Sequence, residues 1–209
     1  MSSAPAPLQL VLVRHGATAW NENRYCQGRR DVHLSGRGRL QAERLREALG
    51  PMRYRRVFSS PLLRAAETAR LLGHEPEPVA ELIEIDRGHW EGHTPEEIRK
   101  RWPKLHEAWY RDPAGLAMPG GEEFDQLWER AGTLLERCAS EIEGPILLCA
   151  HKAINRAILA RALGLPSAQV WGIPQPQACR SLLTRTERGW EAEAVGDVNH
   201  LPPALRSED

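Results

Sequence analysis

The sequence lacks an excess of charge of either sign. Its 28 lysines and arginines balance 28 aspartates and glutamates, so the formal net charge is zero. Nucleic acids and anionic membranes are bound by broad basic surfaces, which a balanced chain does not supply. We therefore expect neither a nucleic-acid nor a membrane partner. Short basic clusters such as Arg53, Arg55 and Arg56 are interpreted as solvated surface.

Cysteine is scarce, and long apolar runs are absent. The four cysteines (Cys26, Cys138, Cys149 and Cys179) are widely spaced and contain no CxxC pair. This spacing indicates neither a disulfide framework nor a zinc site. No run of 18 apolar residues occurs, and no charged-then-apolar segment opens the chain. These absences predict a soluble, cytoplasmic protein.

Several familiar catalytic motifs are also missing, among them the P-loop, GxGxxG and GxSxG. His89 and His93 stand four residues apart, a spacing that faintly resembles a helical zinc pair. Gly88 and Gly92 disfavour a helix in this segment, because glycine weakens helices. We therefore predict that the chain holds no metal ion, and no segment indicates an organic cofactor.

The chain does contain short apolar runs followed by helical patterns. Residues 8–13 and 145–150 are continuous apolar runs, which are typical of strands buried on both faces. A further strand is predicted at 56–59 and a hairpin over 178–195. Helices are predicted over 35–49, 62–72, 95–102, 105–111, 122–142 and 153–163. Strands that alternate with helices predict an α/β protein, a three-layer α/β/α sandwich with a mostly parallel central sheet.

The length of the chain fits a single domain. We expect residues 1–7, which are small and rich in proline, to be a disordered lead-in. Residues 8–201 are expected to form the domain, and residues 202–209 a loose tail. Ser60 is a predicted helix N-cap, with Pro61 at the first helical position.

The two apolar runs end in the same way. One stops at Arg14 and His15, and the other stops at His151. Ligands of open α/β sheets bind at the carboxyl ends of the strands, so the two histidines can meet in one pocket. Arg64 lies one turn into the helix that follows a third strand. Because arginine forks suit phosphate oxygens, this set predicts a phosphate-handling site.

A neutral imidazole can accept a phosphoryl group and pass it to water. The transferring group spreads negative charge over its oxygens, so the site needs fixed cations around it. Two arginines and a second histidine can supply them without a metal. A carboxylic acid must then protonate the departing alkoxide. Glu81, Glu84, Asp86 and Glu91 are equally placed for this task on sequence grounds.

The segment around His15, residues 12–21, resembles the RHGxTxxN signature of the histidine phosphatase superfamily, also called phosphoglycerate mutase-like. Residues 27–38, 59–69 and 82–92 resemble its "QG…D…LS…G", "SSPLxRAxETA" and "LxExxxGxWEG" segments, in the same order. The resemblance covers nearly the whole chain and implies a phosphoglycerate mutase-like fold.

The resemblance also implies catalytic roles. His15 would be the nucleophile that becomes phosphohistidine. Glu84 would be the general acid and then the base for water. Arg14, Arg64 and His151 would bind the phosphoryl oxygens.

Four further residues would contact the substrate. The resemblance places Asn21 and the backbone of Gln27 and Gly28 against the phosphate or its ester oxygen. Lys152 departs from the family, which often has glycine after the second histidine. Its ammonium could reach the phosphate or the substrate, or could point to solvent.

The implied activity is that of a phosphomonoesterase that needs no cofactor and acts on small phosphate esters. One alternative is a mutase of the same superfamily, which returns the phosphoryl group to the product. Such mutases are typically longer, with an insertion after the Glu84-type motif, and this chain is short there. A second alternative is a catalytically idle phosphate-binding module. No pattern in the sequence indicates the particular ester or the oligomeric state.

Overall fold

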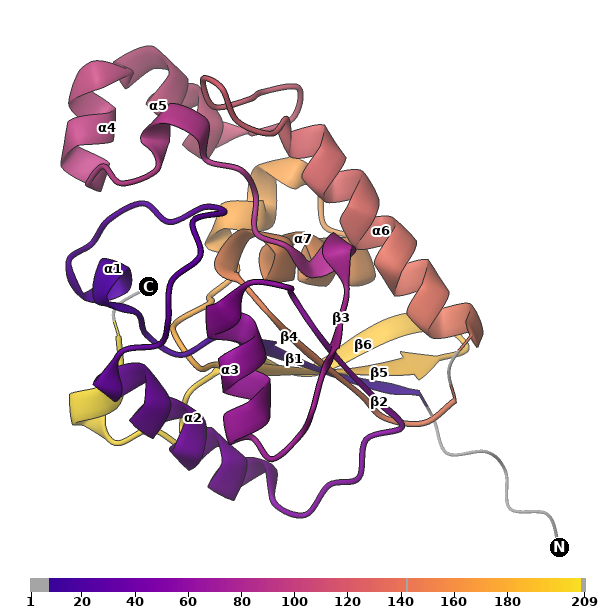
Figure 1. Ribbon diagram of the computed structural model, residues 1–209. Helices are drawn as coiled ribbons and strands as arrows, with labels where there is room; N and C mark the ends of the chain where they lie inside the picture. Colours follow the sequence, from indigo (N-terminus) through magenta and orange to yellow (C-terminus); the bar gives the residue numbers. More distant parts are fainter. Residues whose placement is uncertain (1–7, 142, 208–209) are drawn as a thin grey trace, which may run out of the picture.

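A mixed six-stranded sheet forms the centre of the computed structural model, which describes residues 8–141 and 143–207 (Figure 1). The strand order is β3-β2-β4-β1-β5-β6. The strands are β1 (Gln9–Arg14), β2 (Arg56–Ser59), β3 (Glu77–Pro78), β4 (Ile146–Ala150), β5 (Arg180–Thr186) and β6 (Gly189–Asp197). Strands β3, β2, β4 and β1 pair in parallel, whereas β5 and β6 pair antiparallel and extend the sheet beyond β1.

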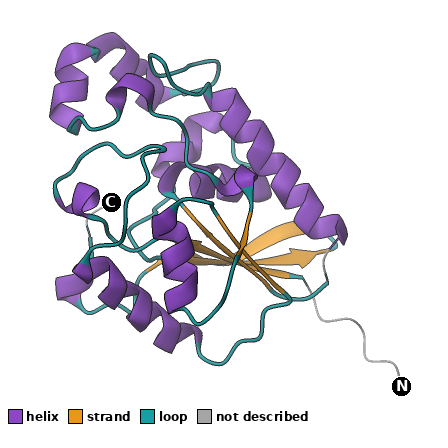
Figure 2. Cartoon of the chain, in the orientation of Figure 1, coloured by secondary structure: helices purple, strands orange, loops and turns teal. Residues whose placement is uncertain are grey.

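Helices cover both faces of this sheet (Figure 2). They are α1 (Ala19–Glu22), α2 (Gly36–Leu49), α3 (Leu63–Leu71), α4 (Pro95–Arg101), α5 (Pro103–Arg111), α6 (Phe124–Glu141) and α7 (Lys152–Ala162). Helices α2 and α3 pack together on one face, and α6 and α7 pack together on the other. This arrangement confirms the predicted three-layer α/β/α sandwich with a mostly parallel central sheet.

The two central strands are buried on both faces, as their continuous apolar sequences predict. Val11 and Val13 of β1 pack in a cluster with Leu45 of α2 and Leu72 beside α3. The alternate residues of the same strand join the larger cluster that includes α6 and α7. This double burial fixes the depth of β1 and β4 in the sheet, and so fixes where the residues that follow each strand emerge.

The start of α3 differs from the prediction. Ser60 is not its N-cap, because the helix begins at Leu63 with Leu62 in the cap position. The N–H of Leu63 donates instead to Oδ1 of Asp31 at 2.7 Å, a partner 32 residues earlier in the chain. The Ser60 hydroxyl accepts from the N–H of Leu62 at 3.3 Å and also contacts the site described below.

Two other boundaries also differ. Pro103, predicted to separate two helices, occupies the first turn of α5, where the missing N–H of proline costs nothing. Helix α6 begins at Phe124 and not at Glu122. Glu122 is buried before the helix, where both of its oxygens contact the guanidinium of Arg130.

The C-terminal segment from residue 202, predicted to be a loose tail, contacts α2 within the described residues up to 207. Pro203–Leu205 form a 3-10 helix. The carbonyl of Leu205 accepts a hydrogen bond from Nε2 of Gln41 at 2.7 Å, and the carbonyl of Arg206 accepts one from Arg37 at 2.6 Å. Residues 1–7, 208 and 209 lie outside the described residues. Within the described ranges, no helix combines the length and the apolar character that a bilayer span requires.

Candidate active site

The structure brings the two strand-end histidines together. Arg14 and Ala150 are paired residues at the ends of the adjacent strands β1 and β4, so His15 and His151 leave the sheet side by side. Their ring centroids are 5.1 Å apart, with an angle of 61° between the ring planes. The carboxyl edge of the parallel sheet therefore carries the site, as the strand-end argument predicts.

The backbone after His15 is held by a close approach to α2. A Cβ atom on Gly16 would lie 2.3 Å from the carbonyl oxygen of Gly38, so neither the loop nor the helix has space for a side chain there. The N–H of Ala17 donates to Oε1 of Gln41 at 2.8 Å. This packing gives a physical reason for the glycine that directly follows His15.

His15 is held as a neutral imidazole with one nitrogen available. Its Nδ1 lies 2.7 Å from the carbonyl oxygen of Gly16, which can only accept, so Nδ1 carries the proton. The lone pair is therefore on Nε2. Burial, together with the positive charges of Arg64 and Arg14, holds the pKa of His15 well below its usual value. The ring is thus uncharged at neutral pH and has a free lone pair on Nε2, which is the state a nucleophile requires.

His151 uses both ring nitrogens within the protein. Nε of Arg64 donates to its Nδ1 at 3.2 Å, so the proton resides on Nε2 and is donated to the Ser60 hydroxyl at 2.7 Å. Burial, followed by the positive charge of Arg64, holds the pKa of His151 well below its usual value. The structure therefore places His151 as a neutral support for Arg64, beside His15 and not on the cavity wall.

Arg64 is a buried cation fixed by three contacts. Besides the contact with His151, it donates to the carbonyl oxygens of Arg30 and Gly28 at 2.9 and 2.8 Å. Burial lowers the pKa of Arg64 to about 10, so it remains charged at neutral pH. Arg14, whose guanidinium donates to the carbonyl of Gln175, stands near it. These two arginines are the fixed cations that a transferring phosphoryl group needs.

Glu84 is the carboxylate that the structure places at the site. One of its oxygens accepts from the N–H of Ile85 at 2.9 Å, and the other accepts from the N–H of Ala153 at 3.1 Å, in the first turn of α7. Each carboxylate oxygen has a second lone pair, which leaves capacity for a substrate or a proton. Glu84 is buried and lines the cavity that also contains His15.

The three competing carboxylates have other partners. Glu81 forms an ion pair with Arg137 at 2.7 Å. Asp86 accepts from the N–H of Gly88 at 2.9 Å. Glu91 accepts from two backbone N–H groups of the loop that precedes α2, each at 2.8 Å. None of the three lines the cavity, so the structure separates candidates that the sequence left equal.

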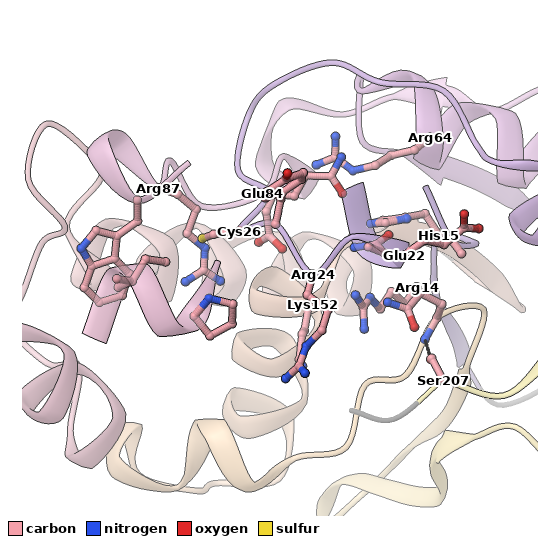
Figure 3. Close-up of a pocket in the computed structure, with 18 of the residues that line it drawn as sticks. Arg14, His15, Glu22, Arg24, Cys26, Arg64, Glu84, Arg87, Lys152 and Ser207 are labelled. Carbon is pink, nitrogen blue, oxygen red and sulfur yellow. Dashed lines mark hydrogen bonds between the residues drawn. The ribbon is translucent and has the colours of Figure 1, made fainter. Parts of the chain in front are cut away.

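A cavity of about 640 Å³ lies over Arg14, His15, Arg64 and Glu84 (Figure 3). Its described lining holds seven side chains with a fixed positive charge and two carboxylates. The cations are Arg14, Arg24, Arg37, Arg64, Arg87, Arg206 and Lys152, and the carboxylates are Glu22 and Glu84. This excess suits an anionic ligand. The sequence predicted three of the cations and missed four, of which Arg37 and Arg87 lie inside the segments that resemble the family.

Three of the four predicted contact residues line the cavity, namely Asn21, Gln27 and Lys152. Asn21 is held by the N–H of Thr18, which donates to its Oδ1 at 3.1 Å. The Nε2 of Gln27 is buried and, among the described residues, has no hydrogen-bond partner. A buried donor without a partner is costly, so this amide indicates a ligand that accepts from it.

The resemblance implies that the backbone of Gly28 contacts the phosphate or its ester oxygen, but the structure shows other partners for it. Its N–H donates to Glu91 at 2.8 Å and its carbonyl accepts from Arg64, so its backbone is used within the protein. It does not line the cavity. The structure thus assigns Gly28 to holding Arg64 in place, a contact that strand-end reasoning has no means of detecting.

In the described part of the chain, no group of three or more histidines, cysteines, aspartates or glutamates is arranged to hold a metal ion. His93 stacks on Trp102, with ring centroids 6.0 Å apart. Cys26 and Cys149 are free thiols.

The buried histidines predict a loss of stability as the pH falls below about 6.5, the usual pKa of an exposed histidine. In that range the unfolded chain binds protons that the folded protein does not, because burial holds the pKa of His15 and His151 low. The free energy of unfolding should fall by up to about 1.4 kcal/mol per pH unit for each such histidine. Above this range both states carry neutral rings, so the contribution is fully present.

Urea unfolding in phosphate-free buffers between about pH 5 and 7.5 measures this slope, since the window spans the unfolded pKa of histidine. His15→Gln should reduce the slope of the unfolding free energy against pH by up to about 1.4 kcal/mol per pH unit, the contribution of one histidine. Equal slopes for the two proteins would show that folding does not shift the pKa of His15.

Comparisons with known proteins agree with this geometry. The family model of the histidine phosphatase superfamily (branch 1) matches residues 10–198. The chain is 33% identical over 202 residues to phosphoglycerate mutase-like protein 4 of Arabidopsis thaliana, covering 92% of this chain and 86% of that protein. It is 30% identical over 186 residues to phosphoserine phosphatase 1 of Hydrogenobacter thermophilus, covering 87% and 88%.

The fold is shared with a solved structure of similar sequence. The mycobacterial glucosyl-3-phosphoglycerate phosphatase in complex with VO3 superposes with a TM-score of 0.82 at 31% identity. The match covers 92% of this chain and all of that one.

Proposed function

The chain belongs to the histidine phosphatase superfamily, and we propose that it hydrolyses small phosphate monoesters through a phosphohistidine on His15. The observation that carries this proposal is the state of the His15 ring. Its Nδ1 proton is held by the carbonyl of Gly16, its pKa is lowered by burial and by two arginines, and it lines the cationic cavity. Nε2 of His15 is therefore a neutral nucleophile facing a site for an anion.

The reaction takes two steps. In the first, Nε2 of His15 attacks phosphorus, the P–O bond to the organic group breaks, and protonated Glu84 gives its proton to the departing oxygen. In the second, the Glu84 carboxylate takes a proton from water, and the water oxygen attacks phosphorus as the P–N bond breaks. The products are an alcohol and inorganic phosphate, and His15 is again neutral. Arg14 and Arg64 hold the phosphoryl oxygens throughout.

The remaining residues bind or position. We assign Nε2 of Gln27 and the amide of Asn21 to the phosphoryl or ester oxygens. Lys152 lines the cavity and is assigned to the phosphate or to the organic group of the substrate. His151 completes the phosphoryl site by holding Arg64.

Hydrolysis is preferred to the mutase reaction. A mutase must hold its intermediate product and exclude water until the phosphoryl group returns to it. Between Glu84 and α6 this chain carries two short helices, α4 and α5, and a loop, without a long insertion. Names of both kinds occur among the relatives, a mutase-like protein and a phosphoserine phosphatase. A catalytically idle module would not need a proton donor at the position of Glu84.

The cytoplasmic location that we expect from the sequence stays a prediction.

A panel of phosphomonoesters assayed with and without EDTA tests this proposal. We expect phosphate release from at least one small ester at a rate that exhaustive chelation leaves unchanged, because arginines supply the charge that a metal would otherwise supply. Formation of an isomeric phosphate ester in place of inorganic phosphate would favour the mutase reaction. Loss of activity with EDTA and rescue by a divalent cation would contradict metal independence.

A further inference from the structure

The guanidinium of Arg87 lies in the cavity, where Glu84 is near enough to favour its charged form but forms no ion pair with it. Among the described residues, no carboxylate is within ion-pair distance of it, and its one side-chain polar contact is to the sulfur of Met118 at 3.8 Å. Its Nε is buried and has no hydrogen-bond partner. A buried donor on a permanent cation is costly unless an acceptor meets it, so Arg87 indicates a ligand that carries negative charge.

The surroundings of Arg87 hold it rigidly. A Cβ atom on Gly28 would lie 2.9 Å from Cγ of Arg87, so the aliphatic stem packs directly on that backbone. The next residue, Gly88, has φ +48 and touches the 119–121 backbone so closely that a Cβ would lie 2.3 Å from the carbonyl oxygen of Pro119. A side chain fixed in this way binds without losing much conformational freedom.

Arg87 stands apart from the phosphoryl-binding groups. In Figure 3, Glu84 lies between Arg87 on one side and His15 and Arg64 on the other. Because His15 attacks phosphorus in line with the departing oxygen, the organic group leaves on the side of phosphorus opposite His15, where Glu84 can protonate that oxygen. Arg87 therefore faces the organic group of the substrate and not the phosphoryl group.

Cys26 and Tyr110 lie near Arg87. Trp90 and Ile98 add apolar surface to the lining of the same cavity. An ion pair in such surroundings is stronger than one in water, and the planar fork of arginine matches the two oxygens of a carboxylate.

Resting on the proposed phosphatase activity, we propose that Arg87 binds a carboxylate on the organic group of the substrate. The preferred substrates are then phosphate monoesters of small hydroxy acids. Glu84 and Arg87 lie three residues apart in one segment and have different roles. Glu84 protonates the departing oxygen, and Arg87 binds the carboxylate of the same organic product. Arg87 is thus a specificity-determining residue.

Two matched esters test this inference, 3-phosphoglycerate and glycerol 3-phosphate, which differ in a carboxylate against a CH2OH group. We expect Arg87→Met, which keeps an aliphatic stem of similar length, to lower kcat/KM for 3-phosphoglycerate by about 10- to 100-fold, the usual worth of a charge-assisted hydrogen-bonded contact. The loss should be mainly in KM. For glycerol 3-phosphate the change should stay within about threefold, because that ester has no carboxylate to lose the contact. Arg87→Lys should lie between.

Arg24→Met is the charge-matched control, because it also removes one cation from the cavity lining. It should affect the two esters equally. A loss of discrimination in Arg24→Met and not in Arg87→Met would overturn the assignment, as would equal effects of Arg87→Met on the two esters. An unchanged affinity for inorganic phosphate in Arg87→Met shows that the variant is folded.

A binding measurement separates this inference from the proposed activity. Calorimetric titration of the two esters into His15→Ala, with and without Arg87→Met, needs no turnover. Preferential binding of 3-phosphoglycerate that disappears with Arg87→Met supports the carboxylate site even if the wild type hydrolyses neither ester. Equal binding of the two esters to His15→Ala overturns it even if hydrolysis is observed.

Discussion

Replacing His15 by alanine is expected to lower turnover by at least about 10³-fold, because the covalent route is lost together with its nucleophile. No other described imidazole in the cavity lining can take its place directly. His106 also lines the cavity, but it comes from α5. His151 has both ring nitrogens engaged, with Arg64 and Ser60. Initial rates with p-nitrophenyl phosphate, at a saturating concentration, measure the loss.

The matched control is His89→Ala, which removes an exposed histidine that does not line the cavity. It should retain wild-type turnover. His15→Ala should still bind inorganic phosphate, because Arg14 and Arg64 are unchanged. Turnover in His15→Ala within a few-fold of the wild type would refute the role of His15.

Replacing Glu84 by glutamine is expected to act on the two chemical steps differently. An alkoxide is a poor leaving group and needs a proton, whereas p-nitrophenolate is a good one and needs it much less. In a single-turnover burst, Glu84→Gln should slow phosphoenzyme formation from an alkyl phosphate by about 10²-fold or more, the usual worth of a positioned acid. The burst from p-nitrophenyl phosphate should change much less. Steady-state turnover should fall for both, because the same carboxylate activates water.

The glutamine variant also carries a structural cost. The two oxygens of Glu84 accept from the N–H groups of Ile85 and Ala153, and an amide can accept from only one of them. Its thermal unfolding should therefore be measured beside the burst. Asp86→Asn is the control, since Asp86 lies outside the cavity lining. Equal slowing of the two bursts in Glu84→Gln, or a leaving-group dependence in Asp86→Asn, would reassign the acid.

The strands around the site could be predicted because their signal is local. Continuous apolar runs over 8–13 and 145–150 can be buried only between two layers, and the structure confirms that their ends meet. The pairing of β5 beside β1 could not be predicted, because a hairpin sequence does not specify its neighbour in the sheet. The contact of Asp31 with the N–H of Leu63 at the start of α3 was not predicted either, because the two residues are 32 positions apart in the sequence.

Of the residues at the candidate site, some could be predicted from strand ends and others could not. Arg14, His15 and His151 follow from the ends of strands, whereas Glu84 followed only from the family resemblance, since three other carboxylates are close in sequence. The structure separates them by their partners. Arg64 contacts Gly28, and Gln41 contacts the C-terminal segment, from distant parts of the chain, and the sequence carries no signal for either contact. The four further cations of the cavity come from separate segments that only the fold brings together.

The most direct test of the account is to trap the covalent intermediate. The protein is mixed with a phosphate ester labelled on phosphorus, quenched within the burst, and digested for peptide mapping. We predict label on the peptide that contains His15, stable in base and lost in acid, as a phosphoramidate is, and absent from His15→Ala. Label that survives acid and is lost in base, as on serine, or label on a peptide without His15, would contradict the account.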